Sequence, residues 1–357
     1  MKLYIYCLPV YLSLGTIIMF CLPTLYALQD PCSTQNRHSN SITRNALSWV
    51  DFDVSFGQGR PYFHQFYQNL VRKILSYQTT NSALHPSIVH NLFTLSKTLH
   101  RTNHPAKIVT SAQPKIPLII HQIWLGSPFP EKYKKWQQTW KNMGPGWQYK
   151  LWTDAEVRKL KLFNQHLYDR ETNYGAKSDI LRIELLYRYG GIYVDTDFEC
   201  LNPEAFKYLH YLYDFYTGFH PADFKVFCLA NGLIGARRGH PVLKGYIDEL
   251  PSHYYTSNNI LLKTGPGFFT FMFLKYAGKN SKDKDIAFGP SYFYPVSLFQ
   301  IQQLKHQPQQ TIKSRVLFPE SIALHWWEGS WWGTRYNKSH NSDWLKYNFA
   351  SQLPHNY

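Results

Sequence analysis

The amino-acid sequence predicts an α/β fold, with a mostly parallel central sheet flanked by helices and an N-terminal helical stem. Three observations support this prediction. From residue 116 onward, strand-like and helix-like segments alternate, which is typical of a parallel sheet. One strand-like segment, IYV at 192–194, is followed at once by two acids, and ligands bind where parallel strands end. The chain has 357 residues, 44% of them hydrophobic, enough for a large core.

The chain begins with a long uncharged run, residues 3–29, between Lys2 and Asp30. This run exceeds the apolar region of about 7–15 residues in a signal peptide and is long enough for a membrane span of about 20. We expect residues 1–29 to be a signal anchor, which makes the protein single-pass and membrane-associated through residues 3–29. The alternatives are a cleaved signal peptide, with residues 1–27 removed and the protein secreted, and a buried soluble segment.

Residues 30–113 form a basic region that lacks glutamate. Apolar residues recur there at helical spacing, from Phe63 to Ile74 and from Ile88 to Leu95, so we expect a small helical stem. A plain linker to the membrane is the alternative interpretation.

The main domain is expected over residues 114–345, with a C-terminal tail over 346–357. Its first strand lies within 116–126, a helix follows over 131–143, and the glycines of 144–146 end that helix. A second strand occupies 147–154. The next helix, 178–191, has Ser178 as its expected N-cap and Gly190 as its stop, and leads into the strand at 192–197.

Charge and cysteine content narrow the class of protein. The net charge of +15 suits an anionic membrane surface or a phosphorylated substrate. Nucleic acid is not an expected partner, because no nucleic-acid-binding motif accompanies the charge. Beyond the N-terminal segment the cysteines are Cys200 and Cys228; two free thiols are expected, and a disulfide between them is the alternative.

Asp195 and Asp197 are separated by one residue, so on an extended strand both carboxylates point the same way. Two like charges on one face are unfavourable unless a cation lies beside them. Oxygen ligands suit Mn²⁺ or Mg²⁺, ions that commonly bind substrate phosphates. The pattern thus predicts a divalent metal site, with exposed turn acids as the alternative.

Two further groups of polar residues accompany this acid pair. Asp179 and Arg182 are three residues apart on one helix, where they form either a clamp facing the site or an ordinary intrahelical ion pair. His325, Glu328 and Ser330 lie among tryptophans near the C-terminus, and His325 is the last residue of the strand-like SIALH. A histidine at the end of a strand is a candidate further ligand; packing in an aromatic surface is the alternative.

Taken together, these motifs resemble glycosyltransferase family 32, the DxD sugar-binding group. The resemblance covers about residues 115–335 and rests on IPLIIHQIWLG, WQYKLWTD, AKSDILRIELLYRYGGIYVDTD, NGLIGARRGHPVL, TGPGFF and HWWEGSW. That family includes mannosyltransferases of glycans and inositol phosphoceramide, and it is similar, more distantly, to the clostridial glucosylating toxins. The resemblance implies a GT-A fold, a GDP- or UDP-hexose donor, a divalent metal and retention of anomeric configuration.

The resemblance also implies roles in donor binding. Trp124 stacks on the donor base and Trp331 lies over the diphosphate. Asp179 and Arg182 hold the donor sugar, and Asp195 contacts sugar or ribose hydroxyls and also serves the metal.

For the metal itself, the resemblance implies that Asp197 is a direct ligand. It leaves the third ligand open, with His325 opposed to Glu328 and Ser330. His121 and Asn231–Gly232 are expected to line the site, and Lys177 and Lys263 to approach the diphosphate.

The function expected is transfer of a hexose, with mannose favoured, from a nucleotide sugar to a glycolipid or glycan acceptor. A toxin-like effector that glycosylates a host protein and a non-catalytic sugar-binding protein are the alternatives. An aspartate-nucleophile phosphohydrolase fits less well, because it expects Thr or Val where this chain has Glu199.

Overall fold

The structure is a computed structural model that describes residues 46–60, 63–76, 84–221, 227–304 and 306–329. All of these residues lie in one compact unit, residues 42–357. The expected signal anchor, the tail 346–357, and Ser330 and Trp331 fall outside them. Among the helices that are described, none combines the length and apolar character needed to cross a membrane.

The central sheet has six strands in the order β2-β1-β3-β6-β5-β7. β1 pairs in parallel with β2 and β3, β5 pairs in parallel with β7, and β6 is antiparallel to both β3 and β5. All strands except β6 therefore run in one direction, which confirms the mostly parallel sheet. The strands are β1 (Ile119–Ile123), β2 (Gln148–Trp152), β3 (Gly191–Val194), β5 (Phe215–Phe219), β6 (Leu229–Ala236) and β7 (Asp285–Phe288).

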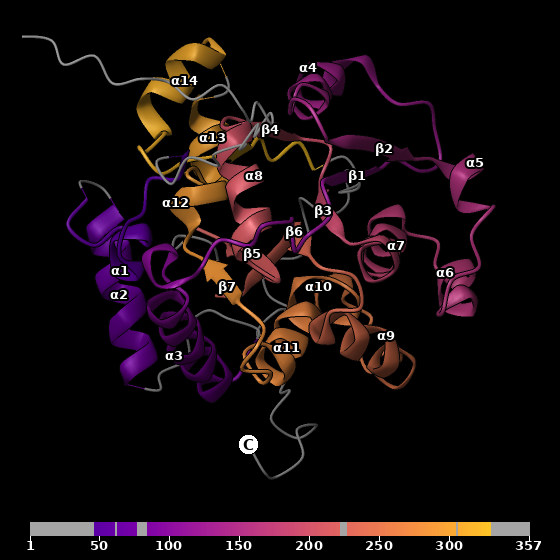
Figure 1. Ribbon diagram of the computed structural model, residues 1–357, viewed down its shortest axis with the longest axis horizontal. Coiled ribbons are helices and arrows are strands. Elements are labelled where there is room, and N and C mark those ends of the chain that lie inside the picture. The colour runs from indigo at the N-terminus through magenta and orange to yellow at the C-terminus, as the bar shows by residue number, and fades with distance from the viewer. Residues whose placement is uncertain (1–45, 61–62, 77–83, 222–226, 305, 330–357) are drawn as a thin grey trace, which may run out of the picture. The chain divides into compact units, whose positions relative to one another are not determined.

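Helices cover both faces of this sheet (Figure 1). The helices are α1 (Phe52–Ser55), α2 (Phe63–Leu75), α3 (Pro86–Thr102), α4 (Glu131–Lys141), α5 (Asp154–Val157), α6 (Gln165–Arg170), α7 (Tyr174–Tyr189), α8 (Pro203–Leu212), α9 (Pro241–His253), α10 (Ile260–Lys263), α11 (Pro266–Tyr276), α12 (Pro290–Phe293), α13 (Leu298–Leu304) and α14 (Gln309–Val316).

Alternation along the strands divides the core into two layers. On β3, Tyr193 packs into the cluster that contains residues of α1, α7 and α9, whereas Ile192 and Val194 pack into the cluster that contains residues of α4, α8 and α12. Successive strand side chains point to opposite faces, so a sheet buried on both sides needs this near-continuous apolar run.

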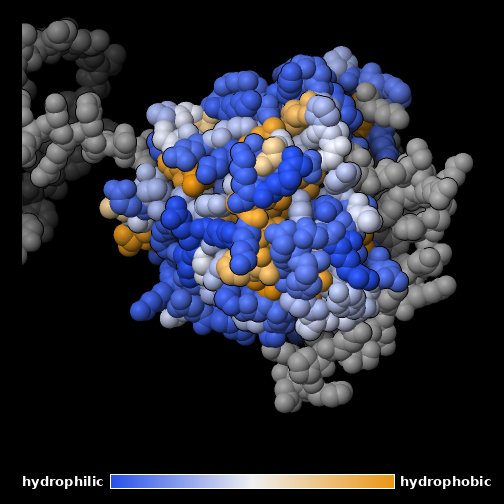
Figure 2. Space-filling model, turned by 90° about the vertical axis from the view of Figure 1, so that its right-hand side faces the viewer, coloured by the Kyte–Doolittle hydropathy of each residue, from blue (hydrophilic) through white to orange (hydrophobic). Residues whose placement is uncertain are grey.

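The surface seen from the right-hand side of Figure 1 is mostly hydrophilic, with a band of apolar atoms across its middle (Figure 2).

The helix that carries Asp179 and Arg182 begins earlier than expected. Asn173, not Ser178, is its N-cap: the Asn173 side chain accepts hydrogen bonds from the backbone N–H groups of Gly175 and Ala176. The expected stop is confirmed, because α7 ends at Tyr189 and Gly190 follows with a φ of 62°.

A second, two-stranded sheet joins distant parts of the chain. β4 (Phe198–Cys200) pairs antiparallel with β8 (Ala323–His325), and His325 lies opposite Phe198. The strand expected in SIALH therefore forms, and its partner begins directly after the acid pair. This pairing places His325 beside Asp197.

The region expected to be a separate stem forms the predicted helices, yet it packs into the main domain. The ring centroids of Phe52 and Phe56 lie 6.2 and 5.1 Å from that of Phe219 on β5. The segment also contacts α12, since the Val50 N–H donates to the Tyr292 hydroxyl at 3.0 Å. The boundary expected at residue 113 is thus not a boundary of packing, because α1–α3 supply apolar surface that the sheet needs.

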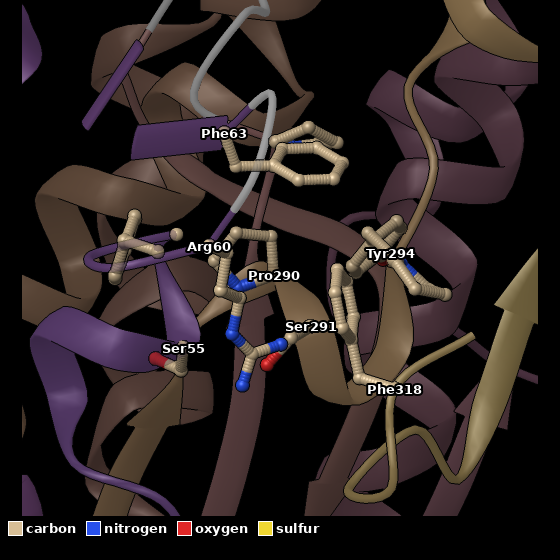
Figure 3. Close-up of a pocket in the computed structure, with 11 residues that line it drawn as sticks. Ser55, Arg60, Phe63, Pro290, Ser291, Tyr294 and Phe318 are labelled. Atoms are coloured by element: carbon tan, nitrogen blue, oxygen red, sulfur yellow. The ribbon is translucent and has the colours of Figure 1, made fainter. Parts of the chain in front are cut away.

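A buried ion pair holds this N-terminal segment against the end of the domain. Arg60 Nη2 lies 2.5 Å from Glu320 Oε1, and the Glu320 side chain is 1% exposed. The guanidinium also lies 4.1 Å from the centre of the Phe318 ring. Arg60 and Phe318 line a small pocket between α1 and α12 (Figure 3).

Cys200 and Cys228 are both buried free thiols, as expected. The Cys200 sulfur lies 3.3 Å from the Met143 sulfur, and Cys228 Sγ lies 3.4 Å from His220 Nδ1. Burial raises the pKa of the Cys200 thiol, so it stays protonated and packs as a small apolar group.

His121 is a core residue and does not line the site, contrary to expectation. It is fully buried, its Nδ1 accepts from Trp152 Nε1 at 3.0 Å, and its Nε2 lies 2.9 Å from the Gly190 carbonyl. Burial lowers the pKa of His121 to about 4 and that of His210 to about 3.

We predict that Arg60→Ala lowers the free energy of unfolding by about 3 kcal/mol, because it leaves the Glu320 carboxylate buried without its counter-ion. Urea denaturation measures this. The control is Lys244→Ala, which removes an exposed ion pair with Asp248 and should leave the urea midpoint unchanged. Equal effects of the two substitutions would contradict the prediction.

We also predict that stability falls as the pH is lowered from 7 to 5. His121 stays neutral when folded but takes up a proton near pH 6.5 when unfolded, so its contribution is complete above pH 6.5 and declines toward its folded pKa of about 4. At pH 5 the free energy of unfolding has lost about 2 kcal/mol through one such histidine. Urea unfolding of His121→Asn at pH 7 and pH 5 should show a smaller decline in the free energy of unfolding than the wild type shows. An unchanged decline would mean that other groups cause it.

Candidate active site

The candidate site lies at the carboxyl end of β3. The strand ends at Val194, and Asp195 continues the pairing with β6 because its N–H donates to the Gly232 carbonyl at 2.8 Å. The chain then turns sharply, since the Phe198 N–H donates to the Asp195 carbonyl at 3.2 Å. Asp197 lies in this turn, so the two carboxylates are brought together by a turn and not by strand alternation.

Asp195, Asp197 and His325 converge on one point. One potential ligand atom from each lies within 4.8 Å of the other two. His325 Nε2 lies 3.1 Å from Asp197 Oδ1, and its other ring nitrogen is buried without a hydrogen-bond partner in the described chain. Two carboxylates and an imidazole are a donor set that suits Mn²⁺. These residues fit a divalent metal.

The segment 325–328 wraps around Asp197. The Glu328 N–H donates to Asp197 Oδ2 at 2.8 Å, and the Trp326 N–H donates to the Asp197 carbonyl at 2.9 Å. Burial favours the neutral acid, but His325 and the Glu328 N–H together outweigh it and hold the pKa of Asp197 below its ordinary value. Asp197 is therefore ionised and available as a ligand at neutral pH.

The Glu328 side chain points away from this cluster. Its Oε2 forms an ion pair with Lys132 Nζ on α4 at 2.6 Å, and the carboxylate is 35% exposed. Of the two candidates within the described residues, His325 lies among the acids and Glu328 contributes only its backbone. Ser330, the other rival, and Trp331 are outside the described part of the chain.

Asp179 and Arg182 form both the ion pair and the clamp that the sequence left as alternatives. Arg182 Nη2 lies 3.1 Å from Asp179 Oδ1, and Nη1 lies 3.4 Å from Asp195 Oδ1. Arg182 also donates to the Asn231 carbonyl at 2.7 Å. One guanidinium thus joins α7 to the acid pair and to β6.

Asp179 is enclosed by hydrogen-bond donors. Asn231 Nδ2 donates to its Oδ1 at 2.8 Å and Thr264 Oγ1 to its Oδ2 at 3.1 Å. Burial nevertheless raises the pKa of Asp179 to about 7, with Arg182 acting in the opposite direction. A carboxyl group that titrates near neutrality beside an arginine is characteristic of a functional site.

Tyr193 is a site residue that the sequence analysis missed. Its hydroxyl donates to Asp195 Oδ1 at 2.5 Å, and the Arg182 guanidinium lies 4.5 Å from the centre of its ring. The signal was present, because Tyr193 and Asp195 are two residues apart and so share a face of the sheet. Burial raises the pKa of Asp195, an effect that Arg182 opposes and Asp197 reinforces.

Trp124 follows the carboxyl end of β1, at the same edge of the sheet as Asp195. It is half-buried, its Nε1 donates to Ser127 Oγ at 3.0 Å, and its ring lies 5.6 Å from Phe129 and 5.1 Å from Tyr133. These contacts form an aromatic group on which a base can stack.

The two lysines expected near the diphosphate bind elsewhere. Lys177 Nζ donates to the Tyr168 carbonyl at 2.9 Å. Lys263 Nζ forms an ion pair with the buried Glu171 at 2.5 Å. Both side chains therefore hold the ends of helices together.

Two family models match the chain. The glycosyltransferase sugar-binding region containing DXD motif matches residues 130–209, which include Asp179, Arg182 and the acid pair. The alpha 1,4-glycosyltransferase conserved region matches residues 235–347, which include His325.

Curated relatives are similar over part of their length. Inositol phosphoceramide mannosyltransferase 3 of Schizosaccharomyces pombe is 29% identical over 183 residues, which is 48% of each chain. An uncharacterized glycosyltransferase of Acanthamoeba polyphaga mimivirus is 29% identical over 193 residues, 52% of this chain and 75% of the relative. The chain thus spans about half the length of the mannosyltransferases it matches.

A bacterial protein and a solved structure are similar as well. The Subversion of eukaryotic traffic protein A of Legionella pneumophila is 31% identical over 111 residues, 24% of this chain and 17% of that protein. Among solved structures, the PaToxG glycosyltransferase has a TM-score of 0.40 at 19% identity and covers 55% of this chain and 80% of its own.

We predict that His325→Ala weakens Mn²⁺ binding by more than about 10-fold. Removal of a residue that only hydrogen-bonds to a metal ligand already lowers metal affinity by about 10-fold or more, and His325 is expected to bind the ion directly. Isothermal titration calorimetry with MnCl₂ measures the affinity. Glu328→Gln is the matched control, because its side chain faces Lys132 while its N–H is kept. Stronger weakening by Glu328→Gln than by His325→Ala would reverse the assignment.

Proposed function

We propose that this chain, which carries the DXD sugar-binding region and the alpha 1,4-glycosyltransferase region of glycosyltransferases, is a metal-dependent retaining hexosyltransferase. It transfers a hexose, with mannose favoured, from a GDP- or UDP-sugar to a glycolipid or glycan acceptor. The observation that carries the proposal is the contact between two adjacent groups: the cluster of Asp195, Asp197 and His325, and the clamp of Asp179 and Arg182. The first suits a metal diphosphate and the second suits the attached sugar.

Each group has a defined task in this proposal. Asp197 and His325 hold Mn²⁺ or Mg²⁺, with Asp195 beside them. When bound, the metal neutralises the negative charge that develops on the leaving diphosphate. Asp179 holds Arg182 in place, and Arg182 fixes the orientation of Asp195, whose carboxylate then accepts hydrogen bonds from sugar hydroxyls. Trp124 stacks on the base.

Retention without a covalent intermediate is supported by the state of Asp179. It is buried and bonded by Arg182, Asn231 and Thr264, so its oxygens are already occupied by donors. An attacking carboxylate needs a free oxygen at the anomeric carbon. We therefore favour attack of the acceptor on the same face that the diphosphate leaves.

The choice of sugar and acceptor rests on the relatives. Several of them are named as mannosyltransferases that act on inositol phosphoceramide, which supports mannose and a glycolipid. A membrane anchor through residues 3–29 would bring the domain to such an acceptor; cleavage after residue 27 would release it instead. The similarity to the Legionella protein supports a second candidate, an effector that glycosylates a host protein.

We predict that a cognate nucleotide sugar with Mn²⁺ raises the melting temperature and is slowly hydrolysed. The screen compares GDP-mannose with UDP-glucose, UDP-galactose and UDP-N-acetylglucosamine, and ligand at about 100 times its Kd should stabilise the fold by about 2.7 kcal/mol. Asp197→Ala should abolish hydrolysis.

Asp169→Asn, an exposed acid on α6, is the control and should keep full activity. Incubation with inositol-phosphate glycolipid or with host-cell lysate then distinguishes the two acceptor classes. If no nucleotide sugar shifts the melting with or without metal, the proposed function is wrong.

A further inference from the structure

Tyr294 is a buried aromatic residue beside the proposed catalytic centre that neither the motifs nor the comparisons single out. It follows α12, is 2% exposed, and its ring lies 5.1 Å from Phe198, 5.6 Å from His325 and 6.0 Å from Trp327. Its hydroxyl is buried and approached by the Leu233 backbone N–H, but its own proton has no acceptor among the residues that the structure describes. Buried polar atoms nearly always have a partner, so this one calls for an explanation.

Gly232 shows where the hydroxyl points. A Cβ atom on Gly232 would lie 3.3 Å from the Tyr294 hydroxyl oxygen and 2.7 Å from Asp195 Oδ2. Both oxygens therefore border the space above Gly232, and a side chain at residue 232 would contact both of them.

Asp195 has one oxygen left for such a donor. Tyr193 and Arg182 both approach Oδ1, at 2.5 and 3.4 Å. No hydrogen bond to Oδ2 occurs among the residues that the structure describes, and this is the oxygen that faces Gly232. A phenol hydroxyl is a suitable donor to a carboxylate.

Tyr294 also borders the pocket next to Arg60 and Ser291, which offers another destination for its hydroxyl (Figure 3). Gly232 and Asp195 do not line that pocket. Because the hydroxyl lies within van der Waals reach of the Gly232 position, it belongs to the Asp195 side of the ring.

We propose that Tyr294 is a positioning residue: its hydroxyl donates to Asp195 Oδ2 once the nucleotide sugar is bound and holds that carboxylate toward the sugar. Asp195 is 30% exposed whereas the Tyr294 hydroxyl is buried, so the substrate meets Asp195 and Tyr294 acts through it. With Tyr193 and Arg182 on Oδ1, both oxygens of the carboxylate then have fixed partners. This inference rests on the proposed glycosyltransferase function.

The test is Tyr294→Phe, which removes one oxygen and keeps the ring contacts. With GDP-mannose and Mn²⁺ as the probe, or the UDP-hexose that the wild-type chain prefers, we expect kcat for donor hydrolysis to fall about 10-fold or more. Binding of the nucleotide sugar should weaken, whereas binding of the nucleoside diphosphate, which lacks the sugar, should not change. The melting temperature should stay the same.

Tyr292→Phe is the matched control, because Tyr292 lies on α12, is fully buried and accepts its hydrogen bond from Val50, away from the acids. A second variant, Gly232→Ala, adds a methyl group 2.7 Å from Asp195 Oδ2 and 3.3 Å from the Tyr294 hydroxyl oxygen, and should reproduce the loss in kcat.

Three outcomes overturn the inference: unchanged kinetics of Tyr294→Phe, an equal loss in Tyr292→Phe, or parallel weakening of nucleoside diphosphate binding. The wild-type chain is measured in the same series. An inactive wild type that binds no nucleotide sugar overturns the proposed function and Tyr294's role with it, whereas an active wild type with an equally active Tyr294→Phe overturns the role of Tyr294 alone.

Discussion

The repulsion between Asp195 and Asp197 is the constraint on which the site depends. Two carboxylates this close at the end of a buried strand are unfavourable unless positive charge and hydrogen-bond donors surround them. The structure supplies these from distant segments: Arg182 from α7, His325 from β8 and the Glu328 N–H beyond it. The fold around the acids is therefore arranged to hold donors against them, and a divalent cation completes that arrangement in the proposed function.

The pairing of strands in the two-stranded sheet and in the mixed main sheet places these hydrogen-bond donors next to the acid pair. β4 leaves the acid pair and pairs with β8, which fixes His325 opposite Phe198. β6 runs against its neighbours, so its first residues, including Asn231, lie at the carboxyl end of β3 where Arg182 and Asp179 bind them. A wholly parallel sheet would have placed the far end of β6 there.

The N-terminal helices contribute to the site indirectly. α1 packs closely against the residue before α12. A Cβ on Gly289 would lie 1.8 Å from the Ser55 hydroxyl oxygen, so there is no room for a side chain at that position. α12 in turn is followed directly by Tyr294, whose ring packs against His325. Residues that resemble a stem in composition thus support the wall of the proposed active site, because their apolar faces cover the sheet.

Local pattern was enough to predict the alternating strands and helices and the stop at Gly190, since strand period, helix period and turn residues act over a few positions. It offered Asp179, Arg182, Asp195, Asp197 and His325 only as separate candidates, and the resemblance to glycosyltransferase family 32 joined them in one expected site. Tertiary structure decided the remainder: that Glu328 pairs with Lys132, that His121 is buried in the core, and that Tyr193 and Tyr294 flank the acids. Those outcomes depend on which side chains from distant segments compete for the same charge and space. Sequence spacing carries no information about that competition.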